Sequence, residues 1–420
     1  MGSESKEREQ AIEGSEAKTP KKAWAMLAII YLASIGASLC QFKTPPLASW
    51  IIPAFGMDAM SFGMQMSIVG IVGLILAFPA AYICRGLGAK NTVLLSVACL
   101  AVGSFGGIIS TNYTVLMVTR LLEGIGLGLI GVVGPTCVSV WFPDKTRGIA
   151  LGIWATWVPL AMVLIYAVAP LMAQSMGWQS VFILCGCIAV VAFILVAAFF
   201  KMPEGKAADF GAAGSFKDTL RLLKNGNLWL LGFVMCIFLF IGSGALSTYY
   251  NTYLMEVHSF DPASASGMVS IFTAIGVVTG PLAGALSDRL APGKKRWGIV
   301  LTFAVYLVGL LFAWPQPGSG AIASIWTFAI IGGIAAGAGA GSIRPLAPIV
   351  AGGGAMGAAV SMAMIQFMQN LGVAVGSPVF GAAMGAFGWS AAGMGILATL
   401  CVVAMVLAAF INPDRRKKKA

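Results

Sequence analysis

The stretch AWAMLAIIYLASIGASLCQFKTPPLASWIIPAFGM, residues 23–57, holds a single charged side chain, Lys43, at its twenty-first position. A bilayer hydrocarbon core about 30 Å thick is crossed by roughly 20 apolar residues in a helix. This stretch is long enough for one membrane span, with Lys43 in the part farther from the amino terminus. The sequence therefore indicates a membrane protein.

Similar stretches recur along the chain and predict twelve membrane spans in an all-α fold. They cover approximately residues 23–50, 61–83, 91–110, 113–140, 148–173, 178–200, 228–255, 264–286, 297–314, 321–349, 356–382 and 389–411. With the amino terminus in the cytoplasm, 23 of the 26 Lys and Arg residues fall in cytoplasmic segments, and only Lys43, Arg120 and Arg344 lie within spans. This distribution follows the positive-inside rule. We expect a multi-pass protein of the bacterial inner membrane or plasma membrane, with both termini in the cytoplasm.

Composition narrows the function. The chain is 59% hydrophobic and 10% charged, and its net charge of +11 is spread over short loops and a basic tail rather than one stripe. Membrane topology and contact with anionic lipid therefore explain the positive charge better than nucleic-acid binding does. The eight cysteines lie in or beside spans and the single histidine, His258, lies in an outer segment, so we expect no metal site and no cofactor. The spans show no nucleophile, base and acid set, so an enzyme is not expected.

A hydrophilic stretch divides the spans into two groups of six. The predicted segments are a cytoplasmic tail (1–22), an amino-terminal bundle (23–200), a linker (201–227), a carboxy-terminal bundle (228–411) and a basic tail (412–420). The two groups echo each other, because Gly177-Trp178 opens span six and Gly388-Trp389 opens span twelve. Repeated six-helix halves are typical of transporters, whose site at the repeat interface is exposed by rocking one half on the other.

The loop between spans eight and nine carries a recognisable motif. Gly284, Asp288 and Arg289, followed by Gly293 and the basic residues 294–296, resemble the G-x-x-x-D-R loop of the major facilitator superfamily. In the first-half copy, Arg85 stands where the Asp is expected. Arg120 with Gly124 and Gly128 resembles the family's span-four motif, and the resemblance covers essentially the whole chain. It implies two pseudo-symmetric six-helix bundles, a single-chain carrier, and gating by Gly284, Asp288 and Arg289.

Two cations in the spans are candidates for the solute site. A charge near the bilayer centre costs roughly 2.5 to 3.5 kcal/mol on insertion scales, so something must offset it. By resemblance, spans one, four, seven and ten line the central cavity, which places Lys43 in that lining; the alternative is a lysine that snorkels to the outer interface. Arg344 precedes Pro345 in span ten and suits a carboxylate, although an anchoring arginine near the cytoplasm is an equal alternative.

Other polar groups complete the predicted pathway. Arg120 and Glu123 lie three residues apart on span four and form either a structural pair or, if protons drive transport, the coupling pair. Uncharged candidates for solute contact are Gln41, Gln65, Tyr249, Tyr250, Asn251, Gln366, Gln369 and Asn370. The last three share a helix face by their i, i+3, i+4 spacing. Amides inside membranes also bridge helices, so a structural role is the alternative for these groups.

These features predict a secondary transporter that moves a small anionic solute by alternating access, by proton symport or anion exchange. A cavity with more positive than negative groups attracts anions. Within the family, the cyanate/nitroimidazole-like and organic-anion branches (monocarboxylate, oxalate/formate-like) are nearest, and nitrate porters are disfavoured because spans two and eight lack arginine. The alternatives are a proton-coupled exporter of neutral or cationic drug-like compounds and a non-transporting membrane receptor. A monomer is expected.

Overall fold

The computed structural model describes residues 20–76, 79–203, 224–314, 321–352 and 354–412, and the described residues are helical, with no strand among them. Most of the predicted linker 201–227 and of the two tails, 1–22 and 412–420, lies outside the described residues. The amino-terminal half contains α2 (Lys21–Phe42), η1 (Pro45–Leu47), α3 (Ala48–Phe55), α4 (Ala59–Leu76), α5 (Pro79–Ile108), α6 (Tyr113–Trp141), α7 (Asp144–Ala155), α8 (Trp157–Met176) and α9 (Gln179–Phe199).

The carboxy-terminal half has the same all-helical character. It contains α11 (Gly226–Leu239), η2 (Phe240–Leu246), α12 (Ser247–His258), α13 (Pro262–Asp288), η3 (Pro292–Lys294), α14 (Lys295–Ala313), α15 (Ala321–Ala351), α16 (Gly354–Ala392), η4 (Gly393–Ala398) and α17 (Thr399–Phe410). The turns η2 and η4 are in the π conformation, which loosens the regular helix locally.

The helices of the described residues account for twelve membrane crossings. Among these residues, eleven helical stretches are apolar and long enough to span a bilayer, and the last of them, Val360–Phe410, runs for 51 residues. At 1.5 Å per residue this stretch is about 77 Å long, more than twice the thickness of a hydrocarbon core. Gly388 interrupts it with φ 79° and ψ 172°, a conformation that favours glycine. The stretch is therefore two spans, and the eleven become the twelve that the sequence predicts.

The break at Gly388 has a counterpart in the other half. Gly177, which separates α8 from α9, has φ 79° and ψ 157°. Each glycine is followed by a tryptophan that packs at the start of the next span: Trp178 lies edge-on to Phe182, and the indole of Trp389 donates to the Glu256 carboxylate. The internal repeat predicted from these Gly-Trp pairs is thus present in the backbone.

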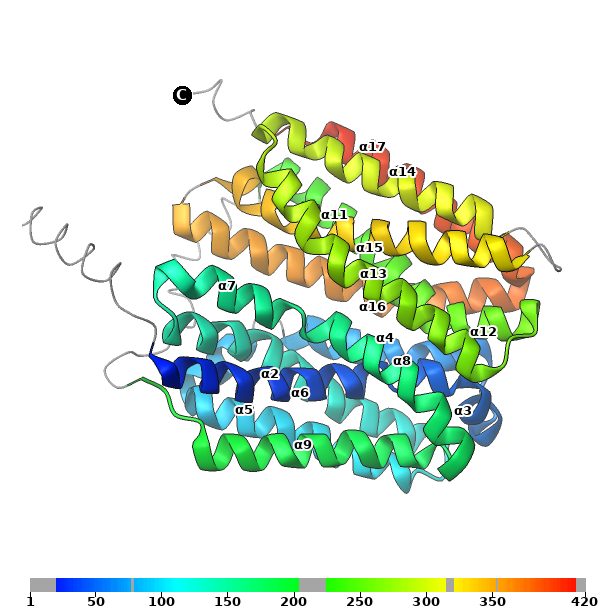
Figure 1. Ribbon diagram of the computed structural model, residues 1–420, viewed down its shortest axis with the longest axis horizontal. Helices are drawn as coiled ribbons and strands as arrows, with labels where there is room; N and C mark the ends of the chain where they lie inside the picture. The colour runs from blue at the N-terminus through cyan, green and yellow to red at the C-terminus, as the bar shows by residue number, and fades with distance from the viewer. Residues whose placement is uncertain (1–19, 77–78, 204–223, 315–320, 353, 413–420) are drawn as a thin grey trace, which may run out of the picture.

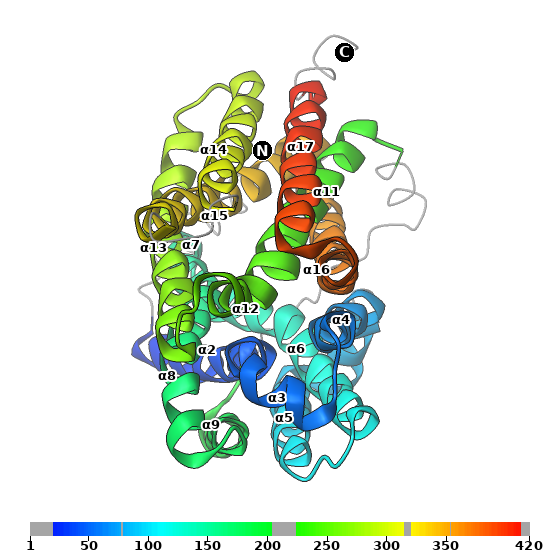
Figure 2. The same cartoon turned by 90° about the vertical axis from the view of Figure 1, so that its right-hand side faces the viewer.

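The two halves lie side by side along their length (Figure 1). Helix α4 packs against α16 and α8 against α13, so each half contributes two helices to the interface. We call the side at which α2 and α11 begin and α9 and α17 end the terminal side, and the opposite side, with α3 and the end of α12, the distal side. Figure 2 views the molecule from the distal side.

Close packing between α13 and α15 sets the position of the second half's charged site. Gly276, Gly280 and Gly284 of α13 face Gly333, Gly337 and Gly341 of α15, and a Cβ built on Gly280 would lie 3.5 Å from the Gly337 carbonyl oxygen. Spacings of four residues place each set on one helix face. Small residues allow helices to approach closely in lipid. Arg344 follows this stripe by one turn of α15.

Candidate transport pathway and its charged groups

A buried ionic network occupies the interior of the amino-terminal half. The Glu123 carboxylate on α6 accepts hydrogen bonds from the Lys43 ammonium, from Arg120 Nη1 at 2.5 Å and from the Ser104 hydroxyl at 2.7 Å. The Lys43 ammonium also donates to Ser104 Oγ at 2.8 Å and lies 3.9 Å from the centre of the Phe182 ring. The exposed fractions are 0% for Lys43, 0% for Arg120 and 1% for Glu123.

Arg120 ties this network to the neighbouring helices. Its Nη1 donates to the Cys40 carbonyl at 2.6 Å and its Nη2 to the Gln41 carbonyl at 2.8 Å, both on α2. Its Nε lies 3.5 Å from the Gln65 carbonyl on α4. The network contains two cations and one carboxylate, so it carries one net positive charge in a buried site. Full hydrogen bonding is what makes such burial tolerable.

Two predictions meet in this network. Arg120 and Glu123 pair as the sequence indicates, and Lys43 is a third member of the same cluster. In this conformation Lys43 has no exposed surface, and its cation is directed at a carboxylate of its own half. Its contact with a solute therefore remains a prediction. Gln41 is half-buried beside the network and contributes its main-chain carbonyl.

Arg344 is in a different environment. Its side chain is exposed, and its Nη2 donates to the amide oxygen of Gln369 on α16 at 2.6 Å. Among the described residues no carboxylate forms an ion pair with Arg344. The α13-facing glycine stripe and the bond to α16 place the side chain on the face of α15 between these two helices. Both helices also contact the other half, α13 through α8 and α16 through α4.

The three amides of α16 separate into different roles. Gln369 is half-buried and accepts from Arg344, whereas Gln366 is exposed and its Nε2 lies 3.4 Å from Asn370 Oδ1. Asn370 packs on α4 of the other half, where its Nδ2 lies 3.1 Å from a Cβ built on Gly73. The structure thus brings Arg344, Gln366, Gln369 and Asn370 together, whereas Lys43 contacts Ser104, Glu123 and Phe182 of the other half.

The Tyr249-Tyr250-Asn251 segment lies at the seam between the halves on the distal side. The Tyr249 hydroxyl shares its one proton between the Ala59 carbonyl at 2.6 Å and the Ser377 carbonyl at 2.9 Å, and Asn251 Nδ2 donates to the Pro45 carbonyl at 2.6 Å. The Tyr166 hydroxyl of α8 donates to the Ser247 carbonyl. Nearer the middle, the Ser270 hydroxyl donates to the Val163 carbonyl at 2.9 Å. The bonds that end on Ala59, Pro45, Ser247 and Val163 join the two halves.

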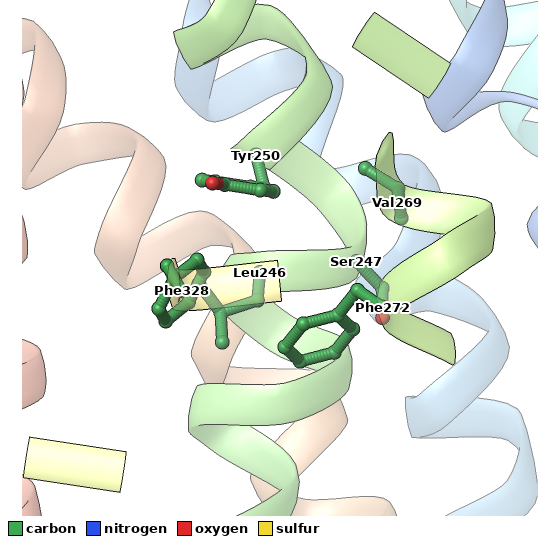
Figure 3. Close-up of a pocket in the computed structure, with 6 residues that line it drawn as sticks. All are labelled: Leu246, Ser247, Tyr250, Val269, Phe272 and Phe328. Atoms are coloured by element: carbon green, nitrogen blue, oxygen red, sulfur yellow. The ribbon is translucent and has the colours of Figure 1, made fainter. Parts of the chain in front are cut away.

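A small cavity lies just inside this seam, within the second half (Figure 3). It is lined by Leu246, Ser247, Tyr250, Val269, Phe272 and Phe328 and is too narrow to hold a water molecule. The Tyr250 ring packs against Phe328 at 5.0 Å, and no described residue forms a hydrogen bond with its buried hydroxyl. Of the three predicted contact residues in this segment, Tyr250 is the one that lines this narrow space.

The predicted gating loop lies on the terminal side. Asp288 and Arg289 are exposed, and Asp288 Oδ1 accepts from the Lys295 ammonium at 3.2 Å. Gly284 lies beside α15, where a built Cβ would be 3.7 Å from the Gly341 carbonyl oxygen. The loop motif thus pairs within the second half in this conformation, and its gating role remains a prediction.

Ser104 and Phe182 were not singled out from the sequence, although both contact the Lys43 ammonium. A lone serine and a phenylalanine in apolar spans carry no pattern of their own. The sequence feature that points to such neighbours is Lys43, because a lysine this far inside a span needs a carboxylate, a hydroxyl or an aromatic face beside it.

Two six-helix halves, joined along two helix pairs and carrying charged groups inside their spans, define a polytopic membrane transporter. Residues 28–365 match the family model described as Major Facilitator Superfamily. The chain belongs to this superfamily, and the resemblance carried by the loop motif is confirmed.

Curated relatives are transporters. The nitrite extrusion protein of Bacillus subtilis (strain 168) is 26% identical over 246 residues, which is 56% of this chain and 60% of that protein. The uncharacterized transporter YycB of the same organism is 25% identical over 369 residues, 85% of each chain. The inner membrane transport protein YdhP of Escherichia coli (strain K12) is 22% identical over 73% of this chain and 78% of its own.

A solved structure shows the same fold. It is a bacterial homolog of the human lysosomal transporter Spinster in an inward-facing, unoccupied conformation. The TM-score is 0.75 at 16% identity, and the alignment covers 96% of this chain and 99% of that one. The predicted fold class, two bundles of six membrane helices, is thereby confirmed.

Proposed function

We propose that this protein moves a small anionic solute across the membrane by alternating access, and that Arg344 is the group that holds the anion. The observation that carries the proposal is the exposed guanidinium of Arg344, whose hydrogen-bond partner is the neutral amide of Gln369. A guanidinium offers two parallel donors to a carboxylate or another planar anion. Its charge is available for a solute because no carboxylate of the described residues neutralises it.

Two further points support an anion. The buried network of the other half is positive overall, so neither half supplies an excess negative charge that would attract a cation. One relative, only part of whose length is matched, is named for nitrite extrusion. We place the terminal side in the cytoplasm, with both termini inside, because the basic residues gather at that side. The bonds at the distal seam then describe a carrier closed to the outside.

Coupling in this proposal involves Glu123. It is the acid that is buried among the described residues, and it accepts from Lys43, Ser104 and Arg120. A proton taken up by Glu123 would weaken all three bonds and loosen α2, α5 and α6 from one another. Exchange of one anion for another would need no such step. Domain boundaries at residues 200 and 228, a monomer and the gating role of Asp288 are part of the same proposal.

The test is ligand-dependent thermal stability of the purified protein. Nitrite, formate, lactate and oxalate are compared with ethidium, a cationic drug-like dye. An anion at 100 times its Kd stabilises the folded state by about 2.7 kcal/mol. We expect at least one anion to raise the unfolding temperature of the wild type and of the control Lys201→Gln, and no anion to do so in Arg344→Gln. Stabilisation by ethidium alone, or anion binding that survives in Arg344→Gln, would contradict the proposal.

A further inference from the structure

We propose that Asn370 is the positioning residue that couples anion binding at Arg344 to the movement of α4. This inference rests on the proposed function, because it takes Arg344 as the anion site. It reassigns Asn370 from a contact of the solute to a contact between the two halves. The geometry of α16 carries it.

Adjacent residues of α16 point to the anion site and to the other half. Gln369 reaches Arg344, and Asn370, the next residue, lies against Gly73 of α4. The exposed Gln366 lies between them on the helix face and bonds to Asn370. An anion that accepts the Arg344 Nη2–H hydrogen bond in place of the Gln369 amide oxygen displaces that amide, one turn of α16 from the exposed Gln366. Any such rearrangement occurs one residue, or one turn, from the contact with α4.

The contact with α4 is tight enough to transmit a displacement. A Cβ built on Gly73 would lie 3.1 Å from Asn370 Nδ2 and 3.3 Å from its Cγ, and one built on Gly70 would lie 2.9 Å from the Ala374 amide nitrogen. Glycines at both positions are what allow α16 to touch the α4 backbone. Packed elements of this density shift as units rather than deform.

Helix α4 in turn reaches both of the other functional regions. Its first residue, Ala59, accepts the Tyr249 hydroxyl at the distal seam, and its Gln65 carbonyl lies 3.5 Å from Arg120 Nε of the buried network. Gly73 is eight residues beyond Gln65, about 12 Å along the helix. One rigid helix therefore connects the anion site, the seam and the charged network, and Asn370 is where the anion site meets it.

The experiment measures the distal opening by electron–electron resonance between spin labels at Thr111→Cys and Ser259→Cys, one in each half, in a Cys187→Ser background. The variants are Gly73→Ala, Asn370→Ala, their combination, and the control Gly106→Ala. The control adds a methyl group with the same 3.1 Å crowding, but against Thr119 of its own half. Anion binding is read in parallel from thermal shifts.

Without any anion, we expect Gly73→Ala to change the ratio of closed to open molecules by about tenfold, the scale of a typical coupling. Gly106→Ala should leave the ratio unchanged, and Asn370→Ala should restore it in the Gly73→Ala background. With an anion, Asn370→Ala should bind within twofold of the wild type while the anion no longer shifts the ratio.

Two results would overturn the coupling role. One is a Gly73→Ala ratio equal to that of the wild type; the other is loss of anion binding in Asn370→Ala as complete as in Arg344→Gln, which would make Asn370 a direct contact. If no anion binds the wild type, the proposed function fails. The anion-free comparison still decides whether Asn370 and Gly73 control α4.

Discussion

Lys43 and Glu123, 80 positions apart in the chain, form an ion pair inside the amino-terminal half, and Arg120 holds the other oxygen of the same carboxylate. The pair joins α2 to α6, and the Ser104 hydroxyl of α5 bridges its two members. The three charges do not balance, so the members of the network are not equivalent. This asymmetry predicts how each substitution acts.

Glu123→Gln leaves two buried cations without a counter-charge and should destabilise the protein by about 3 to 5 kcal/mol. Lys43→Met leaves the neutral pair of Arg120 and Glu123 and should cost much less. The measurement is the thermal unfolding midpoint of each purified variant in detergent. Equal losses in the two variants would show that charge balance does not govern the stability of this network.

Gln369→Glu should suppress anion binding. The new carboxylate would lie where the amide oxygen now meets Arg344 at 2.6 Å, and it would occupy the guanidinium as the solute anion does. We expect the Kd for the stabilising anion to rise about tenfold or more, since charge-assisted bonds contribute roughly 1.5 to 3 kcal/mol. Gln369→Leu is the control and should retain binding. An unchanged anion affinity in Gln369→Glu would show that Arg344 does not bind the anion.

Tyr249→Phe should favour opening of the distal seam. The single proton of this hydroxyl is shared between the Ala59 carbonyl on α4 of the other half and the Ser377 carbonyl on α16 of its own half. The bond to Ala59 crosses the seam and contributes about 1 kcal/mol net, so the closed state should lose roughly fivefold in population relative to the open one. Faster labelling of Thr44→Cys, which is buried in the closed state, by a water-soluble maleimide in a Cys187→Ser background reports the change. Tyr31→Phe, whose hydroxyl bonds to Thr156 within one half, serves as the comparison.

Gly388→Ala should lower stability by about 1 to 3 kcal/mol, because an alanine at φ 79° is strained whatever the space around it. Gly385→Ala, one turn earlier in the same helix, adds a methyl group into open space without a positive φ and should be near neutral. Thermal unfolding of the two variants is compared. If the unfolding midpoint of Gly388→Ala is at or above that of Gly385→Ala, the helix break at residue 388 does not require glycine.

Asp261 caps the distal end of α13 and predicts a small acid dependence. Hydrogen bonds from Ser264, first from its side chain and then from its backbone N–H, lower the pKa of Asp261 below its usual 3.8. A lowered pKa means that the carboxylate stabilises the fold above the unfolded-state pKa and that this contribution is lost as the pH falls through the folded-state value. Asp261→Asn keeps an effective cap without the charge. Its unfolding midpoint should fall less than that of the wild type between about pH 6 and about pH 3.

The fold was predictable because it depends on periodicity and on backbone requirements. Apolar length predicted the spans, and Gly177 and Gly388, each before a tryptophan, marked the repeat that the backbone then shows. The loop motif around Asp288 predicted the family.

The residues of the candidate site could be predicted from the sequence, but most of their contacts between helices could not. Arg120 and Glu123 could be paired from their spacing on one helix, but the partnership of Lys43 with Glu123 depends on how α2 meets α6 across the bundle. Likewise, the shared face of Gln366, Gln369 and Asn370 followed from helix geometry. Which of them faces Arg344 and which faces Gly73 depends on the rotation of α16 between two neighbours.

Four of the bonds across the distal seam end on main-chain carbonyls: those of Ala59, Pro45, Ser247 and Val163. A carbonyl is present whatever the side chain, so the accepting positions are free to drift over evolutionary time without loss of the bond. The donors have no such freedom, because Phe in place of Tyr249 or Leu in place of Asn251 deletes the interaction. Substitutions at the accepting positions of the distal seam should therefore be tolerated better than substitutions of the donor side chains.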